Sequence, residues 1–157
     1  LTFLNPDRDP LGAGYQIIQS KIAVGSGGIF GKGFLQGTQS YLEFLPEKHT
    51  DFIFTLFSEE FGFLGSVLLL LLYALIIYRV IKIGVISRSY FAKLFCYSFG
   101  ASLFIYIFIN MSMVLGLLPI VGSPLPIMSY GGSSMLATMI GFGIVMSAKI
   151  HSKQSIA

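Results

Sequence analysis

The stretch 67-VLLLLLYALIIY-78 decides the fold, because it places twelve apolar or aromatic residues in an unbroken row. It lies in a run of 18 residues without a formal charge between Glu60 and Arg79. A second such run, of 55 residues, separates Lys93 from Lys149. A helix that crosses a membrane needs about 20 mostly apolar residues. The first run therefore predicts one spanning helix, and the second run is long enough for two.

The composition agrees with an integral membrane protein. Charged residues make up 11% of the chain, against about 25% in an ordinary soluble domain, and the mean hydropathy is +0.79. The single cysteine, Cys96, excludes a disulfide framework within the chain. We expect Cys96 to be a small buried apolar residue.

The pattern predicts an all-α integral membrane protein with three transmembrane helices, at about 61–80, 92–115 and 130–148. The segment 116–129 is uncharged but holds Pro119, Pro124 and Pro126, which a regular helix does not accommodate. We expect it to form a re-entrant or interfacial loop packed against protein. The domain division that follows is an extracytoplasmic loop with short helices over 1–58 and a three-span membrane domain over 59–157.

Positive charge predicts the orientation. The connection between the first two spans carries four basic residues and no acidic residue, and the tail carries Lys149 and Lys153. Such segments stay on the cytoplasmic side. The C-terminus is therefore expected to be cytoplasmic, and residues 1–50 extracytoplasmic.

The first fifty residues mix loops and a short helix. The segment 15-YQIIQSKIAV-24 has the spacing of an amphipathic helix lying at an interface. The five glycines of 25-GSGGIFGKGF-34 predict a tight, packed turn. This turn matches neither a P-loop nor a dinucleotide fingerprint. Because no signal peptide precedes the turn-rich opening 5-NPDRDPLGAGYQ-16, we expect a C-terminal part of a larger membrane protein.

Titratable residues gather in 43-EFLPEKHTDFIF-54, directly before an apolar helix. The only other histidine, His151, lies in the tail, which disfavours a zinc site at His49. Carboxylates of Glu43, Glu47 and Asp51 leave a divalent cation such as Mg²⁺ open. A simpler interpretation is that Thr50 or Asp51 caps the helix that begins at FIFTLF. Asp51 precedes six uncharged residues, so its pKa is expected to be raised, which suits a base.

Three polar residues next to or within the spans have structural interpretations. Asn110 is expected to hydrogen-bond to a neighbouring helix. Glu59 and Glu60 are interpreted as stops at the membrane interface.

Four stretches resemble the SEDS family of cell-wall polymerases (shape, elongation, division and sporulation proteins): 5-NPDRDPLGAGYQIIQSKIAVGSGG-28, 37-GTQSYLEFLPEKHTDFIF-54, 59-EEFGFLG-65 and 110-NMSMVLGLLPIVGSPLPIMSYGGSS-134. The last stretch matches the C-terminal signature of the family, in which Ser123 replaces an aliphatic residue. The NPDRDP opening and the GTQS run favour the branch that acts in cell elongation over the division branch. The resemblance covers nearly the whole chain.

The resemblance implies an all-helical bundle of roughly ten spans in the bacterial inner membrane, of which this chain supplies the last three. Without the preceding spans the chain is expected to be inactive. The implied activity is polymerisation of lipid II, a disaccharide-pentapeptide on undecaprenyl diphosphate, beside a class B penicillin-binding protein as partner.

The resemblance also assigns roles to single residues. Asp51 is the catalytic position, and we expect it to act as general base on the acceptor sugar 4-hydroxyl. The diphosphate charge needs a cation or basic side chains. We expect the following residues of the first fifty to bind the substrate or a cation: Lys21, Lys32, Glu43, Glu47, Lys48 and His49. We call the segment 116–129 the proline loop. The family signature at its end supplies Ser129, Gly131 and Gly132, which are expected to let the loop pack closely beneath the site, or to serve helix packing alone.

Two other functions are open. A flippase for the lipid-linked precursor would need polar groups through the middle of the bilayer. The predicted spans hold few polar residues beyond Asn110, Ser98 and Ser102, which disfavours it. A scaffold that only positions a transpeptidase would tolerate replacement of Asp51.

Overall fold

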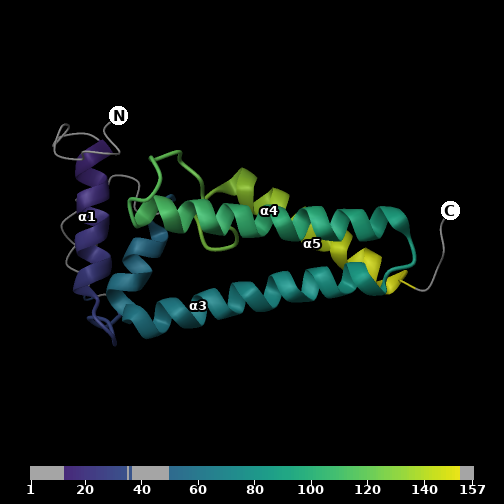
Figure 1. Ribbon diagram of the computed structural model, residues 1–157, viewed down its shortest axis with the longest axis horizontal. Coiled ribbons are helices and arrows are strands. Elements are labelled where there is room, and N and C mark those ends of the chain that lie inside the picture. The colour runs from purple at the N-terminus through teal and green to yellow at the C-terminus, as the bar shows by residue number, and fades with distance from the viewer. Residues whose placement is uncertain (1–12, 35, 37–49, 153–157) are drawn as a thin grey trace.

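The computed structural model describes residues 13–34, 36 and 50–152, and all regular structure within them is helical. The elements are α1 (Ala13–Ser26), α3 (Ile53–Ile86), α4 (Tyr90–Val114) and α5 (Gly132–Ile150). Figure 1 shows α3 and α4 running lengthwise side by side, α5 alongside them, and α1 across one end.

Three of these helices are long and apolar enough to cross a membrane: α3, α4 and α5. The three predicted spans are confirmed, and the chain is a multi-pass membrane protein. Helix α3 covers Ile53–Ile86, where 61–80 was predicted: the predicted start lies next to a break at Gly62, and the helix continues six residues beyond the predicted end. The other two helices end within two residues of their predicted bounds. The division of the chain into two domains stays a prediction.

Two apolar clusters hold the helices together. One lies at the α1 end and joins α3, α4 and the proline loop through Phe52, Phe54, Tyr73, Ile107, Val114 and Leu125. The other joins the opposite ends of α3, α4 and α5 through Val80, Cys96 and Val145. Cys96 is fully buried and free, as predicted.

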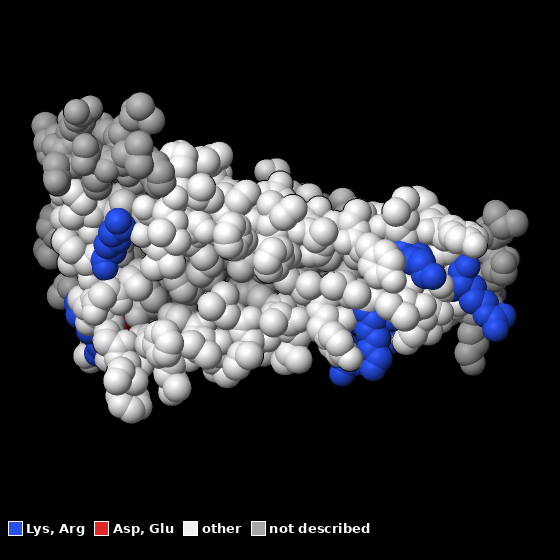
Figure 2. Space-filling view, in the orientation of Figure 1, with Lys and Arg blue, Asp and Glu red and all other residues white. Residues whose placement is uncertain are grey.

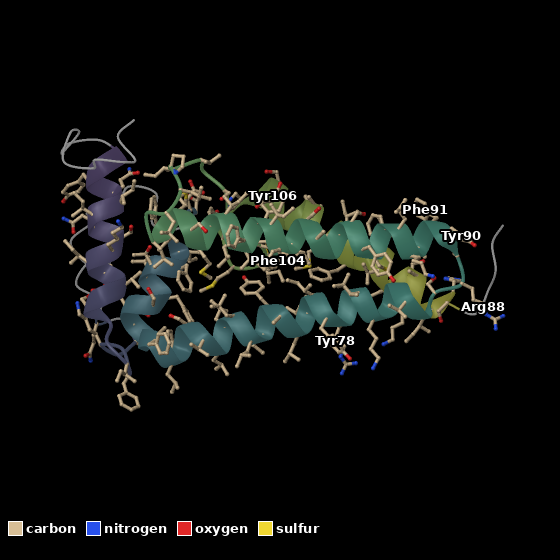
Figure 3. The ribbon with its side chains drawn as sticks, viewed as in Figure 1. Tyr78, Arg88, Tyr90, Phe91, Phe104 and Tyr106 are labelled. Atoms are coloured by element: carbon tan, nitrogen blue, oxygen red, sulfur yellow. The ribbon has the colours of Figure 1, made fainter. Side chains whose placement is uncertain are left out.

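The outward faces of the spans are apolar. Figure 3 shows the side chains along these faces, with Arg88, Tyr90 and Phe91 at the turn between α3 and α4. Large apolar side chains are exposed along α3, α4 and α5, among them Leu68, Phe104 and Leu136. Such surfaces are stable against lipid or against further spanning helices.

Helix α3 is broken at Gly62, whose φ is 67° and ψ −163°. The glycine-rich turn lies in the break. The N–H groups of Lys32 and Gly33 donate to the carbonyls of Glu59 and Glu60, and those of Phe63 and Leu64 donate to Gly28 and Ile29. A Cβ on Gly31 would lie 2.0 Å from the Glu60 carbonyl oxygen. The prediction of a tight, packed turn is therefore confirmed, and the turn satisfies the backbone groups that the break releases.

The predicted helix at 15–24 is present as α1. It buries Ile17, Ser20 and Ala23 along one stripe, at the spacing of a helix face. The hydroxyl of Ser20 donates to the carbonyl of Val114 at 2.9 Å, which fixes α1 to the end of α4.

Candidate active site

Asp51 lies in the turn that leads into α3 and is only 8% exposed. Its carboxylate faces the proline loop, because a Cβ added at Gly122 would lie 3.5 Å from Asp51 Oδ2. Gly122 has a φ of 70°, a conformation that side chains other than glycine rarely adopt. The loop therefore approaches the carboxylate closely at a position that favours glycine.

The interpretation of Thr50 or Asp51 as a helix cap is wrong. Helix α3 begins at Ile53, its N-cap position is Phe52, and no side-chain hydrogen bond caps it. Phe52 is instead buried in the apolar cluster beneath the turn, with 1% of its surface exposed. The position of Asp51 therefore has another cause than the capping of α3.

Two side chains from the C-terminal signature hold the turn, and we call them the clamp: Asn110 of α4 and Ser129 of the proline loop. Asn110 Nδ2 donates to the Asp51 carbonyl at 2.9 Å and to the Ser123 carbonyl at 2.8 Å. Ser129 Oγ donates to the Thr50 carbonyl at 2.8 Å. Asn110 is fully buried, where a hydrogen bond is costly to lose. The clamp therefore fixes the backbone of Thr50 and Asp51 against the loop.

The proline loop itself is anchored on α3. The Tyr73 hydroxyl donates to the carbonyl of Pro126, from the other side of the cluster. The next residue, Ile127, has a φ of 71°, which is strained for a β-branched side chain. Such strain costs about 1–3 kcal/mol and occurs at functional sites. The loop is therefore held in one conformation by several separate contacts.

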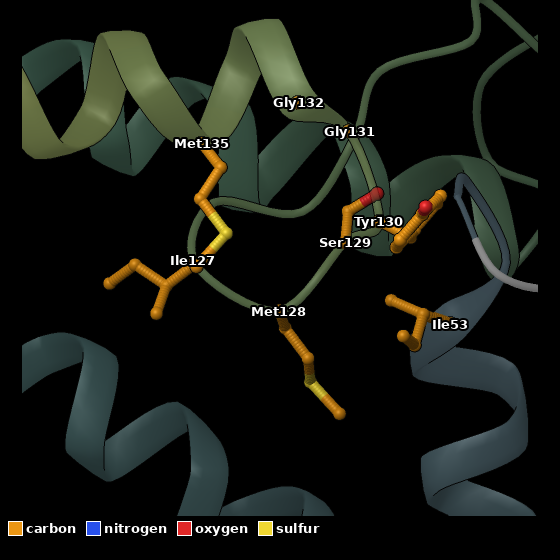
Figure 4. A pocket seen from close by; sticks show the side chains of 8 residues that line it. All are labelled: Ile53, Ile127, Met128, Ser129, Tyr130, Gly131, Gly132 and Met135. Carbon is orange, nitrogen blue, oxygen red and sulfur yellow. The ribbon is translucent and has the colours of Figure 1, made fainter.

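A cavity of about 750 Å³ opens beside the turn. Figure 4 shows the side chains around it, from the start of α3, the proline loop and the start of α5. Its lining is mostly apolar and consists of Ile53, Ile127, Met128, Ser129, Tyr130, Gly131, Gly132 and Met135. Ser129 belongs to both the clamp and the cavity wall, and Ile53 is two residues from Asp51. The turn that carries Asp51 is therefore joined to the cavity wall through Ser129 and Ile53, while Asp51 itself is not among the lining residues.

The serine and the two glycines of the signature differ in their surroundings. Ser129 is buried and bonds to Thr50. Gly132 has open space where a Cβ would be, and a Cβ on Gly131 would meet Ser134 of its own helix turn. In the part of the chain that the structure describes, the two glycines therefore line the cavity rather than admit a neighbouring helix.

Lys32 forms an ion pair with Glu59, with Nζ 2.8 Å from Oε1. The Glu59 side chain is fully buried and the Lys32 side chain is 29% exposed. Glu59 therefore lies inside the fold at the break of α3, and the interpretation of Glu59 and Glu60 as interfacial stops stays a prediction. The contact reveals a structural role for Lys32, which the sequence did not indicate.

The remaining candidates of the cluster, Glu43, Glu47, Lys48 and His49, lie outside the described residues. Lys21 is exposed on α1 next to Gly116. The described residues contain no group of three His, Cys, Asp or Glu side chains that could hold a metal ion. They do not by themselves fit a cation site, and we derive no step through one.

Comparison with known proteins gives one family and several relatives. The FtsW/RodA/SpoVE family model, described as cell cycle protein, matches residues 1–154. The peptidoglycan glycosyltransferase MrdB of Escherichia coli K12 is 54% identical over 153 residues, which are 98% of this chain and 41% of that protein. The peptidoglycan glycosyltransferase RodA of Treponema pallidum is 45% identical over 94% of this chain and 34% of its own length. Stage V sporulation protein E of Bacillus subtilis is 41% identical over 97% of this chain and 41% of its own length.

Two solved structures are similar in fold. One comes from a study of how a peptidoglycan synthase complex coordinates polymerization and crosslinking. Its TM-score is 0.77 at 32% sequence identity, and the match covers 98% of this chain and 41% of that chain. The other is an aspartate-to-alanine variant of the rod shape determining protein RodA of Thermus thermophilus, with a TM-score of 0.66, 34% identity, and coverage of 80% and 39%. The chain spans about two fifths of the length of these proteins.

Proposed function

The chain belongs to the FtsW/RodA/SpoVE family of cell cycle proteins, and from this we propose that it is part of a peptidoglycan glycosyltransferase that polymerises lipid II during cell elongation. The relatives MrdB and RodA are both named peptidoglycan glycosyltransferases. Because the chain covers only 41% and 34% of their lengths, the activity is proposed for the whole protein. The roughly ten-span bundle is part of the same proposal.

One observation carries the proposal: a buried carboxylate, Asp51, is fixed by the clamp beside an apolar cavity at the start of a spanning helix. Lipid II is anchored by its undecaprenyl chain, so its sugars stay close to the membrane surface. A base that acts on it must lie at the same depth. Asp51 precedes a spanning helix, which agrees with a base at the depth of the sugars. The cavity offers an apolar wall to the lipid.

In the proposed reaction the Asp51 carboxylate accepts the proton of the acceptor sugar 4-hydroxyl. The freed oxygen forms a bond to the anomeric carbon of the donor sugar. The bond between that carbon and the diphosphate oxygen breaks, and its electron pair leaves with undecaprenyl diphosphate. The clamp keeps Asp51 in place while the charge moves, since it binds the backbone carbonyls before and after the Asp51 α-carbon.

The leaving diphosphate needs positive charge near it. Lys48 and Lys21 are the proposed side chains, and a Mg²⁺ ion held by Glu43 or Glu47 is the alternative. Lys32 stays a weaker candidate, because Glu59 already offsets its charge at 2.8 Å. His49 is proposed to contact the substrate as part of the same cluster.

Orientation and partner complete the proposal. Five basic residues lie at the end of the spans far from Asp51, and we propose that this end is cytoplasmic and the site extracytoplasmic: Arg79, Lys82, Arg88, Lys93 and Lys149. The partner is proposed to be a class B penicillin-binding protein. A structural relative from a complex that polymerises and crosslinks peptidoglycan supports that pairing.

The test uses the full-length protein with its partner in liposomes that contain fluorescent lipid II. A polymerase converts lipid II into glycan strands that separate by size on a gel. A flippase leaves lipid II unchanged and moves it between leaflets, which a membrane-impermeant quencher detects. We expect strands to form. Transport of lipid II without strands would contradict the proposal.

A further inference from the structure

A second cavity lies at the end of the molecule opposite Asp51, between the last turns of α3 and α5. Its volume is about 430 Å³, within the range of small-molecule sites. It is lined by Arg79, Lys82, Ile83, Ile86, Met146, Lys149 and Ser152. The backbone N–H of Arg88 donates to the Ser152 carbonyl at 3.2 Å, which ties the ends of the two helices together.

The charge of this cavity is of one sign. Arg79, Lys82 and Lys149 form no ion pair in the part of the chain that the structure describes. The acidic residues in that part, Asp51, Glu59 and Glu60, belong to the other end of α3. Figure 2 shows basic side chains gathered at this end and no acidic side chain among them. The site therefore favours an anion.

Apart from the three cations and Ser152, the lining of the cavity is apolar. Ile83, Ile86 and Met146 stand next to the three cations, and Ser152 adds a hydroxyl group. A free phosphate would leave these apolar side chains in water. A phospholipid satisfies both parts, since its phosphate meets the cations while its glycerol and upper acyl carbons cover the apolar side chains.

The depth of the cavity fits a lipid headgroup. Arg79 lies 17 residues after the break at Gly62, and Lys149 lies 17 residues after the start of α5 at Gly132. Each distance corresponds to about 26 Å of helix, and the hydrocarbon core is about 30 Å thick. With Gly62 and Gly132 placed at the near boundary, the long side chains of Arg79 and Lys149 cover the remaining few ångströms to the far boundary, where phosphates lie.

We propose that the cavity between α3 and α5 binds the headgroup of an anionic phospholipid through Arg79, Lys82 and Lys149. The proposal is independent of the glycosyltransferase function. It differs from a general preference of basic residues for one side of the membrane, because it assigns binding to the cavity residues only. Arg88 and Lys93 lie at the same end but outside the cavity.

The test purifies the full-length protein and incubates it with an equimolar mixture of phosphatidylglycerol and phosphatidylcholine. Native mass spectrometry then counts the retained lipids. The cavity variant is Arg79→Gln with Lys149→Gln. The matched control is Arg88→Gln with Lys93→Gln, which also removes one arginine and one lysine. Thermal melting in detergent confirms that both variants are folded.

We expect the wild-type protein and the control to retain phosphatidylglycerol over phosphatidylcholine, and the cavity variant to lose about tenfold of that preference. Equal loss in both variants would show attraction to bulk charge and would overturn the proposal. If the cavity variant does not fold, Lys82→Gln replaces it with Lys93→Gln as its control, and an equal preference in these two variants would overturn the proposal. Equal retention of both lipids by the wild type contradicts an anion site.

Discussion

Asn110 is the residue on which the position of Asp51 depends most directly. Its Nδ2 group serves two carbonyls, those of Asp51 and Ser123, in a fully buried position. Replacement by leucine keeps the branching of the side chain and leaves both carbonyls without this donor, at about 1–3 kcal/mol for each. We expect Asn110→Leu in the full-length protein to lower both the melting temperature and the polymerisation rate.

Ser102 offers a control on the same helix. Among the residues that the structure describes, its hydroxyl bonds only to the carbonyl of Ser98, on the exposed side of α4. Ser102→Ala should leave melting within about 0.5 kcal/mol of the wild type and should not change polymerisation. Full polymerisation by Asn110→Leu would show that the clamp does not position the carboxylate.

The sequence identified these residues only in part. The resemblance assigned Asp51 from its motif, and the isolated amide of Asn110 in an apolar span predicted a buried hydrogen bond. That bond is confirmed, but its partners are loop carbonyls rather than a neighbouring helix. Asp51 lies 59 residues from Asn110, and no local pattern relates two positions so far apart.

At the scale of single elements, the break in α3 depends on Gly62. A Cβ there would lie 2.3 Å from the backbone nitrogen of Gly31, and φ is 67°. We expect Gly62→Ala to strain the backbone and to displace the turn of residues 28–33. The loss of stability should be about 1–3 kcal/mol, measured by melting in detergent.

Gly25 is the matched position for that comparison. It lies in α1, and a Cβ there would meet nothing within 4 Å. Gly25→Ala should be neutral or stabilising by up to about 1 kcal/mol, since alanine is the better helix former. If the two alanine variants melted alike, the close packing at the break would be refuted.

The helices themselves were largely predictable, because long uncharged runs allow few alternatives in a membrane. The break in α3 was not. The stretch 59-EEFGFLG-65 does not predict it, because the conformation of Gly62 is set by the turn of residues 28–33 that packs into it. That contact joins segments about thirty residues apart, so it is visible only in the folded chain.

For the whole molecule, the distribution of charge predicts which end faces the cytoplasm. Val121 is an exposed residue of the proline loop. We expect Val121→Cys to react with a membrane-impermeant maleimide in right-side-out vesicles. His151→Cys, at the basic end, should react only in inside-out vesicles. The background carries Cys96→Ala, because Cys96 is the single cysteine of this chain. The reverse labelling pattern would contradict the orientation.

The apolar outer surface of the spans has no partner that the sequence of this chain can predict. Side chains such as Leu68, Phe104 and Leu136 are exposed on it, and both lipid and further helices would cover them favourably. The sequence of this chain predicts that the surface lies in a membrane. It does not predict which helices pack there, because the contacts would depend on residues of another segment.

The most direct test of the account is the rate of lipid II polymerisation by the full-length protein with Asp51→Asn. The substitution keeps the shape of the side chain and removes the base. We predict a loss of about 10²–10⁴-fold in rate, with lipid II binding and melting temperature unchanged. Polymerisation at the wild-type rate would contradict the central claim and would leave Asp51 with a structural role only.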